Sequence, residues 1–156
     1  MSVAERIAAR LRERGETVAV AESSAGGLVS AALVAQPGAS AFFVAGTVVY
    51  TLEARRHVLE IPDAAVNAIR ASTEAYALLA ARACREQVRT SWGLAESGAS
   101  GPTGNRYGDP PGHACVAVSG AVERALTIET GHANRVENMY VFAERALQLL
   151  AETIGA

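Results

Sequence analysis

Short apolar runs rich in β-forming residues alternate with longer segments of helical periodicity, and no other feature of the chain constrains its fold as much. The run Thr17–Ala21, TVAVA, has the length and composition of a buried strand. Further strands are predicted at 41–50, where Gly46 indicates a bulge, and at 93–97, 114–118 and 125–129. Helices are predicted from Ser2 to Gly15, from the segment 22–27 to Val34, and at 51–59, 72–90 and 135–154. We therefore expect a single α/β domain over residues 1–156, a three-layer α/β/α sandwich on a mixed, mostly parallel sheet.

Two helices carry clear terminal signals. Ser2 and Glu5 have the spacing of a capping box, and Gly15 is suited to end the helix that they begin. Asn134 and Glu137 can cap the last helix at its N-terminus. These signals predict where both helices begin and where the first one ends.

The composition excludes several classes of protein. The formal net charge is −2 and no basic face is evident, so no nucleic-acid partner is expected. No apolar run approaches the roughly 20 residues of a membrane span, and the N-terminus lacks an apolar signal segment, so we expect a cytoplasmic protein. Cys84 and Cys115 form no paired motif and are expected as reduced thiols in or near the core. His57, His113 and His132 lack metal-ligand spacing, so we expect no metal and no other cofactor.

Clusters of small and polar residues stand at three junctions, 22–27, 50–55 and 97–104. Each cluster follows a predicted strand. In open α/β sheets, ligands bind beyond the carboxyl ends of the strands. We therefore expect the three clusters to meet in one crevice.

The first cluster contains two adjacent serines, Ser23 and Ser24, at a predicted helix N-terminus. One interpretation is that a serine only caps the helix. The other is that Ser23 is a nucleophile, with Ser24, Gly26 and Gly27 contacting an anion at the helix N-terminus. Both interpretations can hold, because two serines are present.

The other two clusters give weaker signals. The loop containing Ser97, Gly98 and Gly101 lacks the P-loop and dinucleotide patterns, and it is either a surface turn or a set of amides and hydroxyls facing an oxyanion. Taken alone, Tyr50 is compatible with a half-buried packing residue at the end of a strand. Arg55 is compatible with an ordinary solvated arginine on a helix.

The residues carry a family resemblance. The run VAVAESSAGGLVSAAL resembles the signature of the CinA C-terminal family, which typically has Cys-Thr after AES. FFVAGTVVYTLEAR resembles the strand and YSNEAK motif of that family, SGASGPTG its SGIAGPDGG loop, and PPGHACVAV its PVGTVW strand. The matches occur in the family's order and cover nearly the whole chain, which resembles the stand-alone form of the family.

The resemblance implies an amidohydrolase that converts nicotinamide mononucleotide (NMN) to nicotinate mononucleotide and ammonia. It implies that Ser23 is the nucleophile, that Tyr50 is its proton-transfer partner, and that Ser97 places a hydroxyl at the substrate. It also implies a nucleotide-like ligand and a homo-oligomer, a dimer or larger.

Departures from the family pattern affect the catalytic site. The family's catalytic lysine is replaced by Arg55, which cannot lose its proton. Ala25, Ser72 and the run 103–105 replace other pocket residues. Ala133 and Glu137 stand where arginines near a phosphate are expected, and Arg135 is a candidate substitute.

Three functions follow from these departures. The first is weak hydrolysis of NMN, in which Arg55 would act electrostatically on Tyr50 while Tyr50 takes the proton of Ser23. The second is hydrolysis of a different amide or ester. The third is a non-catalytic paralogue that binds a metabolite or a protein partner.

Overall fold

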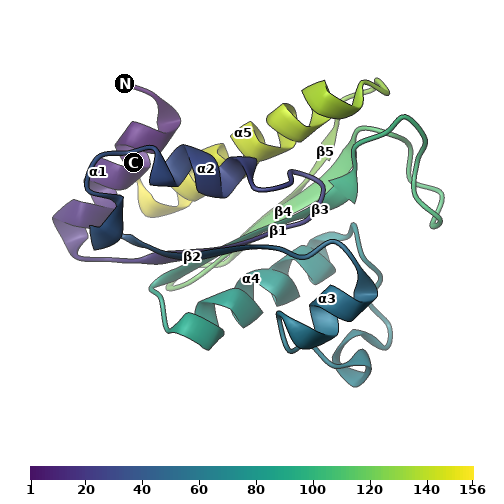
Figure 1. Cartoon of the computed structure of the whole chain (residues 1–156), viewed down its shortest axis with the longest axis horizontal. Helices are drawn as coiled ribbons and strands as arrows, with labels where there is room; N and C mark the ends of the chain where they lie inside the picture. Colours follow the sequence, from purple (N-terminus) through teal and green to yellow (C-terminus); the bar gives the residue numbers. More distant parts are fainter.

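The computed structural model describes all 156 residues (Figure 1). The helices are α1 (Val3–Arg14), α2 (Leu28–Val34), α3 (Leu52–His57), α4 (Glu74–Val88) and α5 (Arg135–Ile154), with short 3₁₀ turns at Ala39–Ala41 and Asp63–Val66. The strands are β1 (Val18–Glu22), β2 (Phe43–Val48), β3 (Trp92–Ala99), β4 (His113–Ser119) and β5 (Arg124–Glu129). All five predicted strands and all five predicted helices are therefore present.

The five strands form one mixed sheet in the order β2-β1-β3-β4-β5. Strand β1 pairs in parallel with both β2 and β3, whereas β4 is antiparallel to β3 and to β5. Only β4 therefore runs against the others. Helices α1, α2 and α5 cover one face of the sheet, and α3 and α4 lie on the other (Figure 1). This is the expected three-layer α/β/α sandwich.

The alternation of side chains along β1 divides the interior into two cores. Val18 and Val20 pack under α1, α2 and α5, in a core of larger aliphatic and aromatic residues. Ala19 and Ala21 face α4, in a core built mainly of alanine. Both cysteines are buried in this second core and are free thiols, as predicted.

Helix α4 approaches the sheet closely because a glycine lies beneath it. A Cβ atom at Gly93 would overlap the backbone carbonyl oxygen of Ala81 and come within 2.9 Å of the Arg85 Cβ. The missing side chain at Gly93 is therefore what allows α4 and β3 to pack at this distance.

The predicted helix caps of α1 and α5 are confirmed. Both hydrogen bonds of the Ser2–Glu5 capping box are present, and Gly15 ends α1 in the left-handed conformation. The Asn134 side chain accepts a hydrogen bond from the Glu137 amide at the start of α5. No helix in the chain combines the length and the hydrophobicity that crossing a bilayer would require.

Two local predictions are wrong. The bulge in β2 lies at Val44, where the pairing jumps from Val18–Phe43 to Ala19–Ala45, while Gly46 pairs regularly with Val20. Gly46 instead makes room for Ser30 of α2, whose hydroxyl would overlap any Cβ there.

The second error concerns the start of α2. The helix begins at Leu28, after a turn at 24–27, so Ser23 is not at its N-terminus. The N-cap is Gly27 with φ +102°, a conformation that side chains of L-residues disfavour.

Candidate functional site

A cavity of about 380 Å³ lies beyond the carboxyl ends of β1, β2 and β3. Ser23, Tyr50 and Ser97 all line it, together with Gly98. The remaining lining residues are Val49, Thr51, Leu52, Ala71, Ser72, Tyr76, Asn105, Arg106 and Tyr107. The three clusters at the strand ends therefore contribute to one cavity, because the parallel strands β2, β1 and β3 end at the same edge of the sheet.

The turn that carries Ser23 is held by a buried carboxylate on the neighbouring strand. Glu96 Oε2 accepts hydrogen bonds from the amides of Ser23 (3.0 Å) and Ala25 (2.9 Å), and Oε1 accepts one from the Ser24 hydroxyl. Burial raises the pKa of Glu96 and the charge of Glu22 adds to the rise, while these three hydrogen bonds oppose it. Ser24 therefore supports the turn and does not line the cavity.

A second buried carboxylate caps α2. Glu22 accepts hydrogen bonds from the amides of Gly27 (3.1 Å), Val29 (2.9 Å) and Ser30 (2.9 Å), and from the Ser30 hydroxyl (2.7 Å). The first amides of the helix are thus occupied within the chain. Neither Gly26 nor Gly27 lines the cavity, so the structure offers no anion site at this helix N-terminus.

Tyr50 is held by Arg135. Arg135 Nη2 donates to Tyr50 Oη at 2.9 Å, and Nη1 donates to the carbonyl oxygen of Gly101 at 2.5 Å. Gly101 is buried, has φ +117°, and does not line the cavity. Arg135 therefore ties the start of α5 to the end of β2 and to the loop after β3.

Arg55 does not line the Ser23 cavity. Its side chain is buried, and its Nη2 donates to Asp63 on the segment that follows α3. Arg55 instead lines a neighbouring cavity of about 260 Å³. The cation in contact with Tyr50 is Arg135, whereas the hypothesis of weak NMN hydrolysis has Arg55 acting on Tyr50.

Ser97 receives a hydrogen bond from the backbone amide of Ser72 at 3.1 Å. Because that bond uses an acceptor site of the Ser97 oxygen, its hydroxyl hydrogen remains free to donate into the cavity. Ser72 has φ +60°, which turns its amide toward Ser97.

Sequence reasoning missed three polar lining residues, namely Tyr76, Arg106 and Tyr107. Asn105 shapes the loop, since its Oδ1 accepts hydrogen bonds from the amides of Tyr107 (3.0 Å) and Asp109 (3.1 Å). Burial raises the pKa of the Tyr76 hydroxyl, and the charge of Arg55 opposes this rise. The length and Gly/Pro content of the loop after β3 indicated a functional segment, but nothing in the sequence singled out Arg106 and Tyr107.

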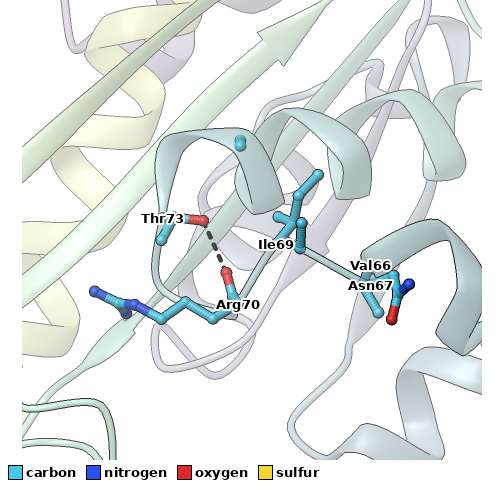
Figure 2. A pocket seen from close by; sticks show the side chains of 7 residues that line it. Val66, Asn67, Ile69, Arg70 and Thr73 are labelled. Atoms are coloured by element: carbon cyan, nitrogen blue, oxygen red, sulfur yellow. Dashed lines mark hydrogen bonds between the residues drawn. The ribbon is translucent and has the colours of Figure 1, made fainter.

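A larger cavity of about 640 Å³ lies along the segment 66–75 (Figure 2). Thr73 Oγ1 donates to the carbonyl oxygen of Arg70 there, and the Arg70 side chain extends away from Asn67 and Ile69 (Figure 2). Arg70 is the only charged residue that lines it. The cavity holds no nucleophile paired with a second catalytic group, so the smaller cavity at Ser23 is the candidate site.

His113 secures the wall of the site behind Ser72. Its Nδ1 faces Glu129 Oε1 at 2.5 Å, and its Nε2 faces the Ser72 carbonyl oxygen at 2.8 Å. Burial alone lowers the pKa of His113, but the Glu129 and Ser72 hydrogen bonds and the charges of Asp109 and Glu129 outweigh it and raise the pKa. Both ring nitrogens face acceptors, so the imidazolium form fits the site.

We expect His113 to make stability depend on pH. A raised folded-state pKa means that its contribution is fully present below the ordinary value of 6.5 and is lost as pH rises through the folded value. Urea unfolding of the wild type should therefore show a midpoint that falls between about pH 6 and pH 9 more than that of His113→Gln. Equal slopes in the two proteins would contradict the assignment.

The chain contains no cluster of three or more His, Cys, Asp or Glu residues that could hold a metal ion. The polar groups that line or adjoin the candidate site are hydroxyls, the Tyr50–Arg135 pair, Asn105 and Arg106.

The comparisons with known proteins agree on the family. The model of the CinA C-terminal domain matches residues 1–154. CinA-like proteins of Salinibacter ruber and Anaeromyxobacter dehalogenans are 33% and 36% identical over 93% and 92% of this chain, which spans only 35% of the length of each. The crystal structure of a competence-damaged protein (CinA) superfamily protein from Klebsiella pneumoniae matches this chain with a TM-score of 0.91 and 26% sequence identity. The match covers 98% of this chain and 96% of the Klebsiella chain. The crystal structure of a competence/damage-inducible protein from Agrobacterium tumefaciens is also 26% identical in sequence and has a TM-score of 0.86. That match covers 100% of this chain and 98% of the Agrobacterium chain. The chain belongs to the CinA C-terminal domain family.

Proposed function

We propose that the protein is a slow serine amidohydrolase that acts on the carboxamide of a pyridine nucleotide such as NMN. The observation that carries the proposal is the convergence of Ser23, Tyr50 and Ser97 on one cavity. The volume of about 380 Å³ lies within the usual range for small-molecule sites. Family membership supports the reaction class, because the resemblance implies this chemistry for these positions.

In the proposed reaction, Ser23 Oγ attacks the amide carbonyl carbon and its proton passes to the Tyr50 oxygen. Arg135 donates a hydrogen bond to that oxygen, which holds the Tyr50 side chain in place beside the cavity. The Ser97 hydroxyl is placed to donate to the carbonyl oxygen as negative charge develops there. Collapse of the tetrahedral intermediate returns the proton to the leaving nitrogen, which departs as ammonia, and water then hydrolyses the acyl-serine.

The proposed reaction is slow for a geometric and a chemical reason. Ser23 Oγ makes no hydrogen bond to any group of the chain, so no base is positioned on it in this structure. Arg55, which stands where the family has lysine, faces Asp63 and remains a donor-only cation. Loss of a general base costs on the order of 10²–10⁴ in rate.

A second candidate is a paralogue that binds the nucleotide, or a related metabolite, without turning it over. The same absence of a partner on Ser23 Oγ favours it. Hydrolysis of a different amide or ester would use the same groups. These alternatives differ from the main proposal in turnover or in substrate, and both can be measured.

Ammonia release from NMN tests the proposal. We expect slow turnover by the wild type, none by Ser23→Ala, and no full recovery by Arg55→Lys, because Arg55 lies outside the Ser23 cavity. Calorimetric titration of Ser23→Ala with NMN gives binding apart from turnover. Binding without turnover in the wild type would favour the second candidate, and turnover that survives Ser23→Ala would refute the assigned nucleophile. Full rescue by Arg55→Lys would show that position 55 reaches the reacting atoms.

A further inference from the structure

The cavity of about 260 Å³ beside the candidate site is lined by an unusual number of cations. We call it the arginine cavity. Its lining includes Arg55, Arg56, Arg70 and Arg106, and Asp63 is the only acidic residue among them. It adjoins the Ser23 cavity, and the two share the lining residues Leu52, Ala71, Tyr76, Arg106 and Tyr107. The two cavities therefore adjoin, and these side chains lie along their common boundary.

Arg55 has unused hydrogen-bonding capacity. The residue is 6% exposed, its Nη2 donates to Asp63, and its Nε is buried without any partner. Asp63 also accepts from Arg56 at 2.8 and 3.2 Å, so one exposed carboxylate serves two guanidinium groups. A buried donor without a partner is costly, and an anion in the cavity would relieve that cost.

Two further arginines are held in place by an aromatic ring. The guanidinium groups of Arg70 and Arg106 each lie 5.0 Å from the centroid of the Tyr107 ring. Arg106 Nη2 also donates to Tyr107 Oη at 2.8 Å. Arg70 is neutralised by Asp109, whereas Arg106 has no carboxylate within ion-pair distance. Arg106 thus brings an unneutralised charge to the boundary between the two cavities.

We propose that the arginine cavity binds the phosphate monoester group of the ligand whose reacting group lies beside Ser23. A phosphate dianion matches several positive charges, and its tetrahedral oxygens can accept from guanidinium groups that approach from different directions. A carboxylate has one charge and accepts in one plane. The link to Ser23 rests on the proposed function, but binding of phosphate to the arginines does not require turnover.

Calorimetric titration with inorganic phosphate, in a buffer free of other oxyanions, tests the site directly. We expect Arg106→Gln to weaken phosphate binding about tenfold or more, since a charge-assisted contact is lost. Arg55→Gln should weaken binding as well. Because the Arg106 side chain is exposed, Arg106→Gln should fold normally, so it tests the site even if the change at the buried Arg55 disturbs folding. The control Arg145→Gln, on the exposed side of α5, should bind phosphate as the wild type does.

A competition arm separates a substrate subsite from a site for free phosphate. NMN should displace phosphate, and nicotinamide riboside, which lacks the phosphate group, should not. Absence of phosphate binding, or equal binding by the wild type and both cavity variants, would overturn the proposal. Phosphate that NMN fails to displace would overturn its link to the Ser23 cavity. Ser23→Ala should bind phosphate normally, so a protein that never hydrolyses NMN can still pass this test.

Discussion

Replacement of Glu96 by alanine should destabilise the protein by about 3 kcal/mol or more, because three donors, two of them buried, would lose their shared acceptor. The amides of Ser23 and Ala25 and the hydroxyl of Ser24 all donate to this carboxylate. Glu96 is 3% exposed, so water cannot replace it without opening the structure. The turn that carries Ser23 would lose its support, and ligand binding in the adjacent cavity should be lost with it.

Urea unfolding followed by circular dichroism measures this effect. Glu96→Gln is the informative companion, since it retains one acceptor oxygen and should cost less than the alanine variant. Glu152→Ala removes an exposed carboxylate from the end of α5 and should change stability by less than about 0.5 kcal/mol. A Glu96→Ala protein as stable as the Glu152→Ala protein would show that the hydrogen bonds at Glu96 contribute little.

Replacement of Gly93 by alanine should cost about 3 kcal/mol, the upper part of the range for overpacking a core. The new methyl group would overlap the Ala81 carbonyl oxygen, which belongs to the backbone of α4 and cannot turn aside. The helix would have to move away from β3, and Tyr76 in its first turn would move with it. We therefore expect weaker ligand binding in the Gly93→Ala protein as well as lower stability.

Thermal unfolding compared with Gly131→Ala isolates the steric cause. Gly131 has φ +78°, and no atom lies within 4 Å of the position that a Cβ would take, so alanine there adds only backbone strain of about 1–2 kcal/mol. Gly93 shows the opposite situation, with an ordinary φ and no space. Equal losses in the two variants would mean that α4 can shift freely, and would refute close packing at Gly93 as the cause.

The sequence allowed the fold to be predicted wherever a signal was local. The alternation of short apolar runs with segments of helical periodicity predicted the strands and helices. The capping residues Ser2 and Asn134 predicted where two of the helices begin. The start of α2 could not be predicted, because its cap is the Glu22 side chain, which folds back from the end of β1 onto the amides of Gly27, Val29 and Ser30. A carboxylate at the end of an apolar strand has the pattern of an exposed polar junction, and its burial depends on the tertiary structure.

The candidate site was predictable in location and less so in its contacts. Three junction clusters at the ends of parallel strands had to meet, and Ser23, Tyr50 and Ser97 do line one cavity. The partner of Arg55 could not be predicted, because the segment after α3 folds back and brings Asp63 to it. The contact between Arg135 and Tyr50 joins residues 85 positions apart, and no sequence pattern indicates it.

The dependence of the Ser23 turn on Glu96 has a consequence for the order of folding. The two ends of this contact are separated by 73 residues, and β1 reaches β3 only when the intervening chain has closed into a long loop. Because closing a long loop costs entropy, we expect this contact to form after local hairpins such as β4–β5. At a synthesis rate of about 5–20 residues per second, Glu96 is therefore added to the chain several seconds after Ser23. A nascent or partly folded chain has the proposed nucleophile Ser23 but no cavity around it, so we expect no ligand binding before the domain is complete.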